Sequence, residues 1–243
     1  MKNMIINDMK TIILTCKNNL TMNNLYFFSW MQKRAEMYSA IAESDFLNLK
    51  KVDFCFADPE AGWVDMTVRF DGKTVAELSL SGVWGSDPVA DLLIWTEKCI
   101  KDNHIPHYLY HDGEGRDYVF HFEELMFPPK YDGFDYKHYY SSGIFSLFIY
   151  DRDNEKFIYT LCDTEEFRKN LYKAVCDFAK RQKNNDRAVR DWAWYIYDQK
   201  VLNRYKENEK CDDEKDEKLA RKMMLKNLRS SKIEKYLQKS SKK

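Results

Sequence analysis

The segment GWVDMTVRFDGKTVAELSLSG, residues 62–82, constrains the fold of this chain more than any other. Apolar and polar side chains alternate on both sides of Asp71-Gly72, which is typical of strands that have one buried face. The segment therefore predicts an antiparallel hairpin. We expect a three-residue loop, 70–72, with its glycine in the left-handed conformation, because this register gathers most apolar residues on one face. The expected pairs are Val68 with Thr74 and Met66 with Ala76.

Two further segments predict helices that have recognisable starts. Asp87 precedes Pro88, so a capping carboxylate is followed by a residue preferred at the first helical position. Asp163, with Glu166 three residues later, is the second start signal. Apolar residues at helical spacing follow both, which predicts that both helices pack on a sheet. The first stripe is Val89, Leu92, Leu93, Thr96, Cys99 and Ile100, and the second is Phe167, Leu171, Val175 and Phe178.

The remaining elements complete an α+β pattern. Strands are indicated at 52–56, within 107–124, at 144–150 and at 156–162, and further helices at 27–41 and from 186. Glycine (8) and proline (5) are scarce, which argues against a sandwich of many short strands and tight turns. We predict an α+β fold: an antiparallel sheet of about five to seven strands with helices packed on one face, then a helical C-terminal region and a basic tail.

Composition divides the chain into four parts. We expect an N-terminal segment, 1–22, that need not be ordered, an α+β core domain at 23–183, and an aromatic C-terminal helix at 184–206. A charged linker and basic helical tail occupy 207–243. The aromatic helix holds two Trp and two Tyr within residues 192–197, and we expect it inside the protein rather than on a partner surface.

Three of the five histidines lie in HYLYHDGEGRDYVFHFEE, residues 107–124. A five-residue loop, 112–116, would pair His107 with His121 and place His111 on the same face. A loop with an even number of residues would turn His121 to the other face. Segregation of the aromatic residues favours the five-residue loop. Because imidazoles bind metals and transfer protons, His107, His111 and His121 are candidate metal ligands; the alternative is an ordinary hairpin.

The segment PPKYDGFDYKHYYSSG, residues 128–143, is the candidate partner-binding site. It combines turn residues with many aromatic rings and has little periodicity. Aromatic loops are favoured recognition surfaces because tyrosine supplies contact area at low entropic cost. The alternative is that these rings cover the sheet edge. The candidate residues are Tyr131, Phe134, Tyr136, Tyr139 and Tyr140.

Charge is unevenly distributed, although 39 basic and 39 acidic residues balance over the whole chain. Residues 218–243 hold ten Lys and Arg against one acid, a charge of +9, which leaves −9 for the first 217 residues. Such a segment can bind nucleic acid, an acidic membrane or an acidic protein, fold back on the acidic body, or remain solvated. The candidate nucleic-acid contacts are Arg221, Lys222, Lys226 and Arg229.

Several function classes leave no signature in the chain. Six cysteines without a CxxC pair indicate reduced thiols, so we expect a cytoplasmic protein. The sequence has no transmembrane run, phosphate-binding glycine loop, dinucleotide fingerprint, GxSxG or HExxH motif. We therefore expect no cofactor, name no catalytic residue and lean against an enzyme.

These observations favour a non-catalytic domain that binds a protein partner. The order of hairpin, capped helix, hairpin, strand pair and helix resembles that of small bacterial proteins that neutralise partner proteins, such as toxin-immunity proteins. That resemblance implies inhibitor- or immunity-like binding. Two alternatives stay open: a nucleic-acid-associated protein that uses the basic tail, and a metal-dependent enzyme that uses the histidine hairpin.

Overall fold

The computed structural model describes most of the chain from residue 48 onward. The described residues are 48–82, 87–101, 107–111, 117–127, 140–151, 154, 156–185, 192 and 213–240. The chain has two compact units, Met1–Asn48 and Leu49–Lys243, and every described residue except Asn48 belongs to the second. The helix expected at 27–41 and most of that expected at 184–206 lie outside the described residues. Trp192 is described, and it is fully buried.

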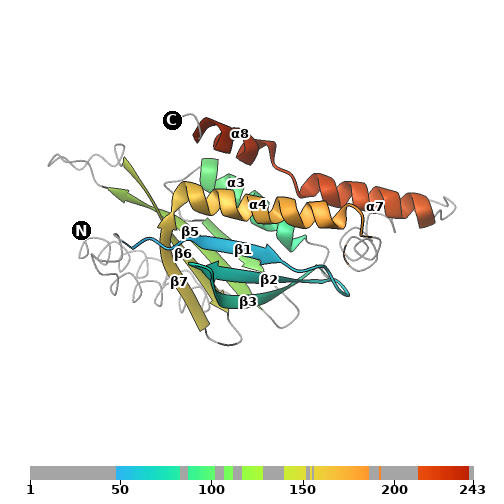
Figure 1. The fold of residues 1–243 in the computed structure, drawn as a ribbon, viewed down its shortest axis with the longest axis horizontal. Coiled ribbons are helices and arrows are strands. Elements are labelled where there is room, and N and C mark those ends of the chain that lie inside the picture. The colour runs from blue at the N-terminus through green and yellow to red at the C-terminus, as the bar shows by residue number, and fades with distance from the viewer. Residues whose placement is uncertain are drawn as a thin grey trace, which may run out of the picture. The chain divides into compact units, whose positions relative to one another are not determined.

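The second unit has the predicted α+β class (Figure 1). Its strands are β1 (Val52–Phe56), β2 (Trp63–Phe70), β3 (Lys73–Ser81), β4 (His107–His111), β5 (Tyr118–Phe127), β6 (Tyr140–Asp151) and β7 (Lys156–Asp163). The described helices are α3 (Pro88–Lys101), α4 (Thr164–Gln182), α7 (Asp213–Asn227) and α8 (Ser231–Ser240). All the strand pairs are antiparallel, in two sheets of order β1-β2-β3 and β4-β5-β6-β7. The strand number is as expected for the described residues, but the strands are divided between two sheets.

The hairpin of β2 and β3 is confirmed, whereas its predicted loop is wrong. Asp71 and Gly72 alone form the loop, with φ angles of 50° and 79°. Positive φ at both central residues is the geometry of a type I′ turn, whose twist matches that of the flanking strands. Phe70 therefore pairs directly with Lys73. The turn needs only two residues because Asp, like Gly, tolerates the left-handed conformation.

A β-bulge further along the hairpin restores the apolar register. The shift lies between Val68 and Arg69 of β2 rather than in the turn. A bulge adds one residue to one strand, so the pairing beyond it moves by one position. The resulting pairs are Val64 with Leu80, Met66 with Leu78 and Val68 with Ala76, and all six side chains are buried.

Both predicted helix starts are confirmed. The Asp87 carboxylate accepts hydrogen bonds from the backbone N–H groups of Val89 and Ala90 at 3.1 and 3.0 Å. The Asp163 carboxylate accepts one from the Glu166 N–H at 2.7 Å. These caps satisfy amides that have no partner inside the helix. The apolar stripe of α4 is also confirmed, with Phe167, Leu171, Val175 and Phe178 buried.

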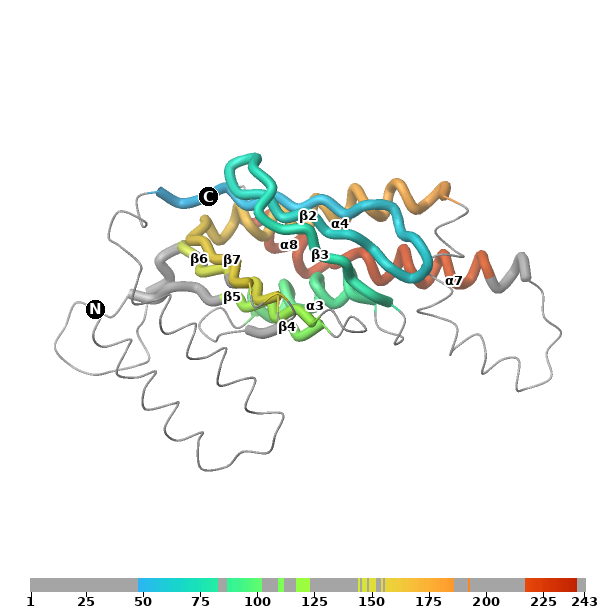
Figure 2. Tube along the Cα trace, turned by 90° about the horizontal axis from the view of Figure 1, so that it is seen from below, coloured from blue at the N-terminus to red at the C-terminus, as the bar shows by residue number. Residues whose placement is uncertain are grey.

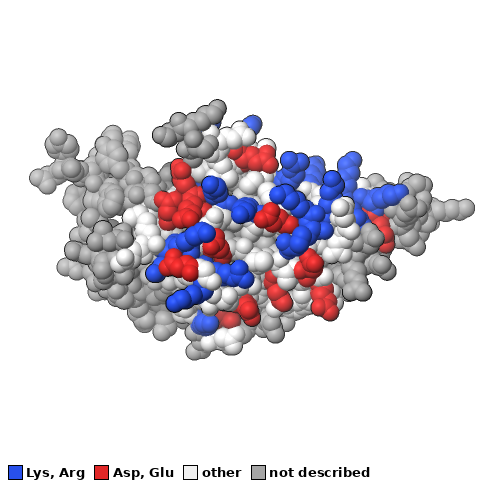
Figure 3. Space-filling view, in the orientation of Figure 1, with Lys and Arg blue, Asp and Glu red and all other residues white. Residues whose placement is uncertain are grey.

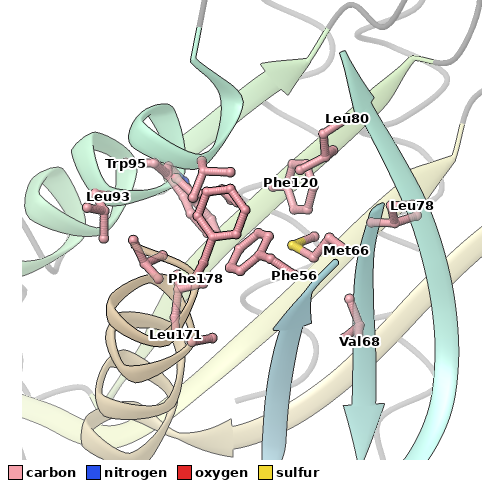
Figure 4. Packing of buried hydrophobic residues seen from close by; sticks show 14 of the residues in the cluster. Phe56, Met66, Val68, Leu78, Leu80, Leu93, Trp95, Phe120, Leu171 and Phe178 are labelled. Atoms are coloured by element: carbon pink, nitrogen blue, oxygen red, sulfur yellow. The ribbon is translucent and has the colours of Figure 1, made fainter. Parts of the chain in front are cut away.

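One hydrophobic cluster joins both sheets to the helices (Figure 4). Trp95 of α3, which the predicted stripe omitted, connects the layers. Its ring centroid lies 5.3 Å from that of Phe122 in β5 and 6.4 Å from that of Phe167 in α4. Figure 4 shows this packing through Phe56, Met66, Val68, Leu78, Leu80, Leu93, Trp95, Phe120, Leu171 and Phe178. Each fully buried side chain of this size contributes roughly 1.5–3 kcal/mol.

The C-terminal helices fold back and enter the same cluster. Ala220, Met224 and Leu228 in and just after α7, and Ile233 of α8, are each no more than 1% exposed. Figure 2 shows α7 continuing into α8, which contacts α3 and α4. Of the alternatives open for the basic tail, the structure therefore shows the fold-back arrangement for residues 217–239.

A buried arginine ties α8 to the two central helices. The Arg168 guanidinium of α4 donates to the Tyr236 hydroxyl at 2.6 Å and to the Cys99 carbonyl at 2.9 Å. The Tyr172 hydroxyl of α4 also donates to the Glu234 carboxylate at 2.7 Å. The planar arginine fork can reach two acceptors at once, which a lysine cannot do in the same geometry.

Candidate functional site

The histidine hairpin forms, but its loop has six residues, 112–117, instead of five. The register is set by the pairs His107 with Phe122, Tyr108 with His121, and His111 with Tyr118. An even loop places His111 and His121 on opposite faces of the sheet. The prediction that the three histidines share one face was therefore wrong. The error came from treating the aromatic residues as one set, whereas the structure distributes them over both faces.

His111 has a structural position between the two sheets. It is 5% exposed, and its Nε2 accepts a hydrogen bond from the Ser81 backbone N–H of β3 at 3.0 Å. Its ring also stacks on Tyr118, with centroids 6.3 Å apart. A nitrogen that accepts this bond is not available to a metal. Among the described residues, no group of three or more His, Cys, Asp or Glu is arranged to hold a metal ion.

The buried thiols of Cys99 and Cys162 are not activated as nucleophiles. Burial raises the pKa of both Cys99 and Cys162, and the carboxylates of Asp163 and Glu166 raise that of Cys162 further. A thiol kept protonated in this way is a poor nucleophile. Cys55, in contrast, is exposed.

The face of the four-stranded sheet opposite Phe120 carries a row of side chains that crosses all four strands. We call Tyr110, Val119, Tyr150 and Phe157 the sheet-face row. Each residue pairs with the next across β4, β5, β6 and β7. By strand alternation these residues point away from the face on which Phe120 contributes to the core.

The sheet-face row is accessible at the surface. Tyr110 is 55% exposed and the other three side chains are partly exposed. The Tyr150 and Phe157 rings stack at 4.3 Å between centroids with an interplanar angle of 13°. On the same face, His121 and Ser146 are fully buried, so exposure decreases along the strands away from the row.

No sequence pattern indicates that the sheet-face row is a surface. The segments at 144–150 and 156–162 are almost continuously apolar, and such runs predict strands covered on both faces. Only the pairing of all four strands brings Tyr110 into line with Tyr150 and Phe157. A sequence pattern can indicate a strand, but it does not identify its neighbours.

The aromatic segment predicted to bind a partner joins β5 to β6. Its candidates Tyr131, Phe134, Tyr136 and Tyr139 lie outside the described residues. Tyr140 is the first residue of β6 and pairs with Phe127. Tyr150 is ten positions further along the same strand, which corresponds to roughly 30 Å. Tyr140 and the sheet-face row are therefore at opposite ends of the β5-β6 pair.

The four basic candidates lie in α7 and the turn after it. Lys222, Lys226 and Arg229 are exposed, whereas Arg221 is half-buried. The Arg221 guanidinium donates to the Lys183 backbone carbonyl at 2.9 Å, next to the end of α4. Arg221 therefore has a positioning contact, and the other three present their charges to solvent.

Comparison with known proteins supplies no relative: no family model, curated protein or solved structure matches this chain. Within the described part of the chain, no helix has the length and apolar character needed to cross a membrane. Function must therefore be argued from the surfaces described above.

Proposed function

We propose that this protein is a non-catalytic binding domain that engages another protein through the sheet-face row. The observation that carries the proposal is the exposure of Tyr110 at 55% in line with a stacked Tyr150–Phe157 pair. Aromatic side chains dominate protein interfaces because each adds a large contact area while few rotatable bonds are immobilised. A flat, partly exposed row of this kind fits a protein surface.

Charge supports a protein rather than a nucleic acid as the partner of this row. The first 217 residues, which contain all four strands of this sheet, carry a formal charge of −9. Phosphate backbones are repelled by such a charge. The aromatic segment at 131–140 remains a second proposed contact, which is tested separately from the row.

The proposal is tested by quantitative capture from nuclease-treated lysate of the source organism. We expect a protein retained in stoichiometric amounts by the wild-type chain and lost by the double variant Tyr110→Ser/Phe157→Ser. Tyr110 is half exposed, so its replacement alone should change stability by less than about 0.5 kcal/mol. The thermal unfolding midpoint of each variant shows whether loss of binding reflects loss of fold.

Ile94→Ser is the matched control. Ile94, on α3, is 50% exposed and is the other large apolar side chain exposed among the described residues. Its replacement should leave the captured protein in place. If the variant Tyr110→Ser/Phe157→Ser retains the captured protein and Tyr136→Ser loses it, the binding site lies in the aromatic segment instead. Absence of any stoichiometric protein partner would contradict the proposal.

A further inference from the structure

The outer side of α7 carries a basic stripe. Lys218, Lys222 and Lys226, spaced by four residues, are exposed, and so is Arg229, which follows the end of the helix. Residues at this spacing lie on one side of a helix, and successive members are about 6 Å apart along its axis. The opposite side carries the buried residues that belong to the core, so the stripe is held on a fixed support.

The C-terminal end of α4 extends this basic surface. The bond from Arg221 to the Lys183 carbonyl brings α7 next to the end of α4, where Lys180 and Lys183 are exposed. Figure 3 shows Lys and Arg gathered over the C-terminal half of α4 and over α7. We call Lys180, Lys183, Lys218, Lys222, Lys226 and Arg229 the basic surface.

Three of these cations have no counter-ion within the described part of the chain. Lys180 contacts the Asp177 carboxylate at 3.3 Å, and Arg229 lies 3.9 Å from that of Glu234. Lys183, Lys222 and Lys226 make no ion pair with any described residue. As far as the described residues show, Lys183, Lys222 and Lys226 therefore carry positive charge available for an external anion.

We propose that the basic surface binds the phosphate backbone of duplex nucleic acid without reading its sequence. Phosphate contacts by Lys and Arg supply most of the affinity in non-specific binding. The exposed stripe of α7 contains no aromatic residue, and stacking platforms are what single-strand binders need. A membrane is also disfavoured, because the apolar side of α7 is buried in the core and cannot enter lipid. This site is independent of the sheet-face row.

The test is fluorescence anisotropy of the full chain with a labelled duplex DNA at several salt concentrations. When four of the six residues of the basic surface contact phosphates, the logarithm of the association constant should fall with the logarithm of the salt concentration with a slope of about −3.6. The double variant Lys222→Gln/Lys226→Gln should reduce the magnitude of that slope by about two, since each lost phosphate contact removes about one. Its affinity at low salt should fall by about tenfold or more.

Lys73→Gln/Lys98→Gln is the matched control, because it removes the same charge from exposed positions on β3 and α3. Its slope and affinity should equal those of the wild type. An equal loss in the control would overturn the proposal, as would tighter binding of single-stranded DNA or equal competition by polyglutamate. A dissociation constant for duplex DNA above about 10⁻⁴ M at low salt would also overturn the proposal. Unchanged unfolding midpoints confirm that each variant is folded.

Truncation at Glu217 is not a usable test of this surface. It would remove the basic stripe together with Met224, Leu228 and Ile233, which are fully buried. Loss of binding would then follow from loss of the fold. Point substitutions on the exposed side of α7 separate the two effects.

Discussion

Helices α4 and α7 bury their apolar sides in the same hydrophobic cluster but with side chains of different size. α4 contributes Phe167, Leu171 and Phe178, whereas the α7 region contributes Ala220, Met224 and Leu228. The neighbouring α8 adds to the attachment of this C-terminal region. It buries Ile233, and its polar side chains contact Tyr172 and Arg168 of α4. One helix can therefore be part of the core on one side and present basic side chains to solvent on the other.

The shared core predicts a large loss of stability from the same truncation in α4 and in the α7 region. Leu171 and Leu228 are each 0% exposed, so Leu171→Ala and Leu228→Ala both leave a cavity in the shared core. We expect each to lower the free energy of unfolding by about 2–5 kcal/mol. Denaturant unfolding measures both. A change below about 0.5 kcal/mol for Leu228→Ala, the size typical of surface substitutions, would show that the C-terminal region is not part of the core.

Arg168 gives a smaller but more specific test of the contact between α4 and α8. Arg168→Met removes the donor to the Tyr236 hydroxyl and leaves the buried Cys99 carbonyl without this partner. We expect a loss of about 1–3 kcal/mol in unfolding free energy. Tyr236→Phe, which removes only the hydroxyl, should lose about 1 kcal/mol.

A double-mutant cycle separates the contact from general packing. Because Arg168 and Tyr236 share a hydrogen bond, the double variant should lose less than the sum of the two single variants. Additivity would contradict a direct interaction between the two side chains.

The Glu97 carboxylate of α3 contacts Ser230 and Lys232 at the start of α8, and this contact depends on pH; its expected effect is the smallest. Partial burial raises its pKa, but the hydrogen bonds from Lys232 and Ser230, at 2.7 and 2.6 Å, outweigh burial and hold the pKa below the ordinary 4.5. The carboxylate therefore stabilises the fold above about pH 4.5, and this contribution is lost as pH falls through the lower folded-state pKa.

Glu97→Gln should accordingly lower the unfolding free energy at neutral pH by less than about 1 kcal/mol, since the pair is partly screened by solvent. Urea unfolding of the wild type and of the variant across the acidic pH range measures the difference in unfolding free energy. The gap between wild type and variant should narrow as pH falls. A gap that stays constant or widens towards acidic pH would contradict the ion pair between Glu97 and α8.

Local signals in the sequence predicted the elements well where one short motif determines the outcome. The carboxylates of Asp87 and Asp163 start α3 and α4 as expected, because capping depends only on neighbouring amides. The α+β class followed from the same kind of evidence. The β2-β3 register could not be predicted in this way. A bulge inside the hairpin compensates for the short turn, and the alternation of apolar and polar residues does not reveal it.

The surfaces depended on contacts between distant segments and were harder to predict. His121 was placed on the wrong face because one residue of loop length reverses every side chain in a strand. The sheet-face row requires the order of four strands, which no local pattern contains. Of the basic surface, Lys222 and Lys226 were found from charge alone, whereas Lys183 joins them only through the contact of α7 with the end of α4.

Native-state hydrogen exchange of the full chain shows whether α7 and α8 unfold together with α4. Amides near Met224 and Ile233 should exchange with the same opening free energy as those near Leu171, because all three side chains are buried in one cluster. Rapid exchange of the α7 and α8 amides while those of α4 stay protected would contradict the account and identify the C-terminal region as a separate, weakly held segment.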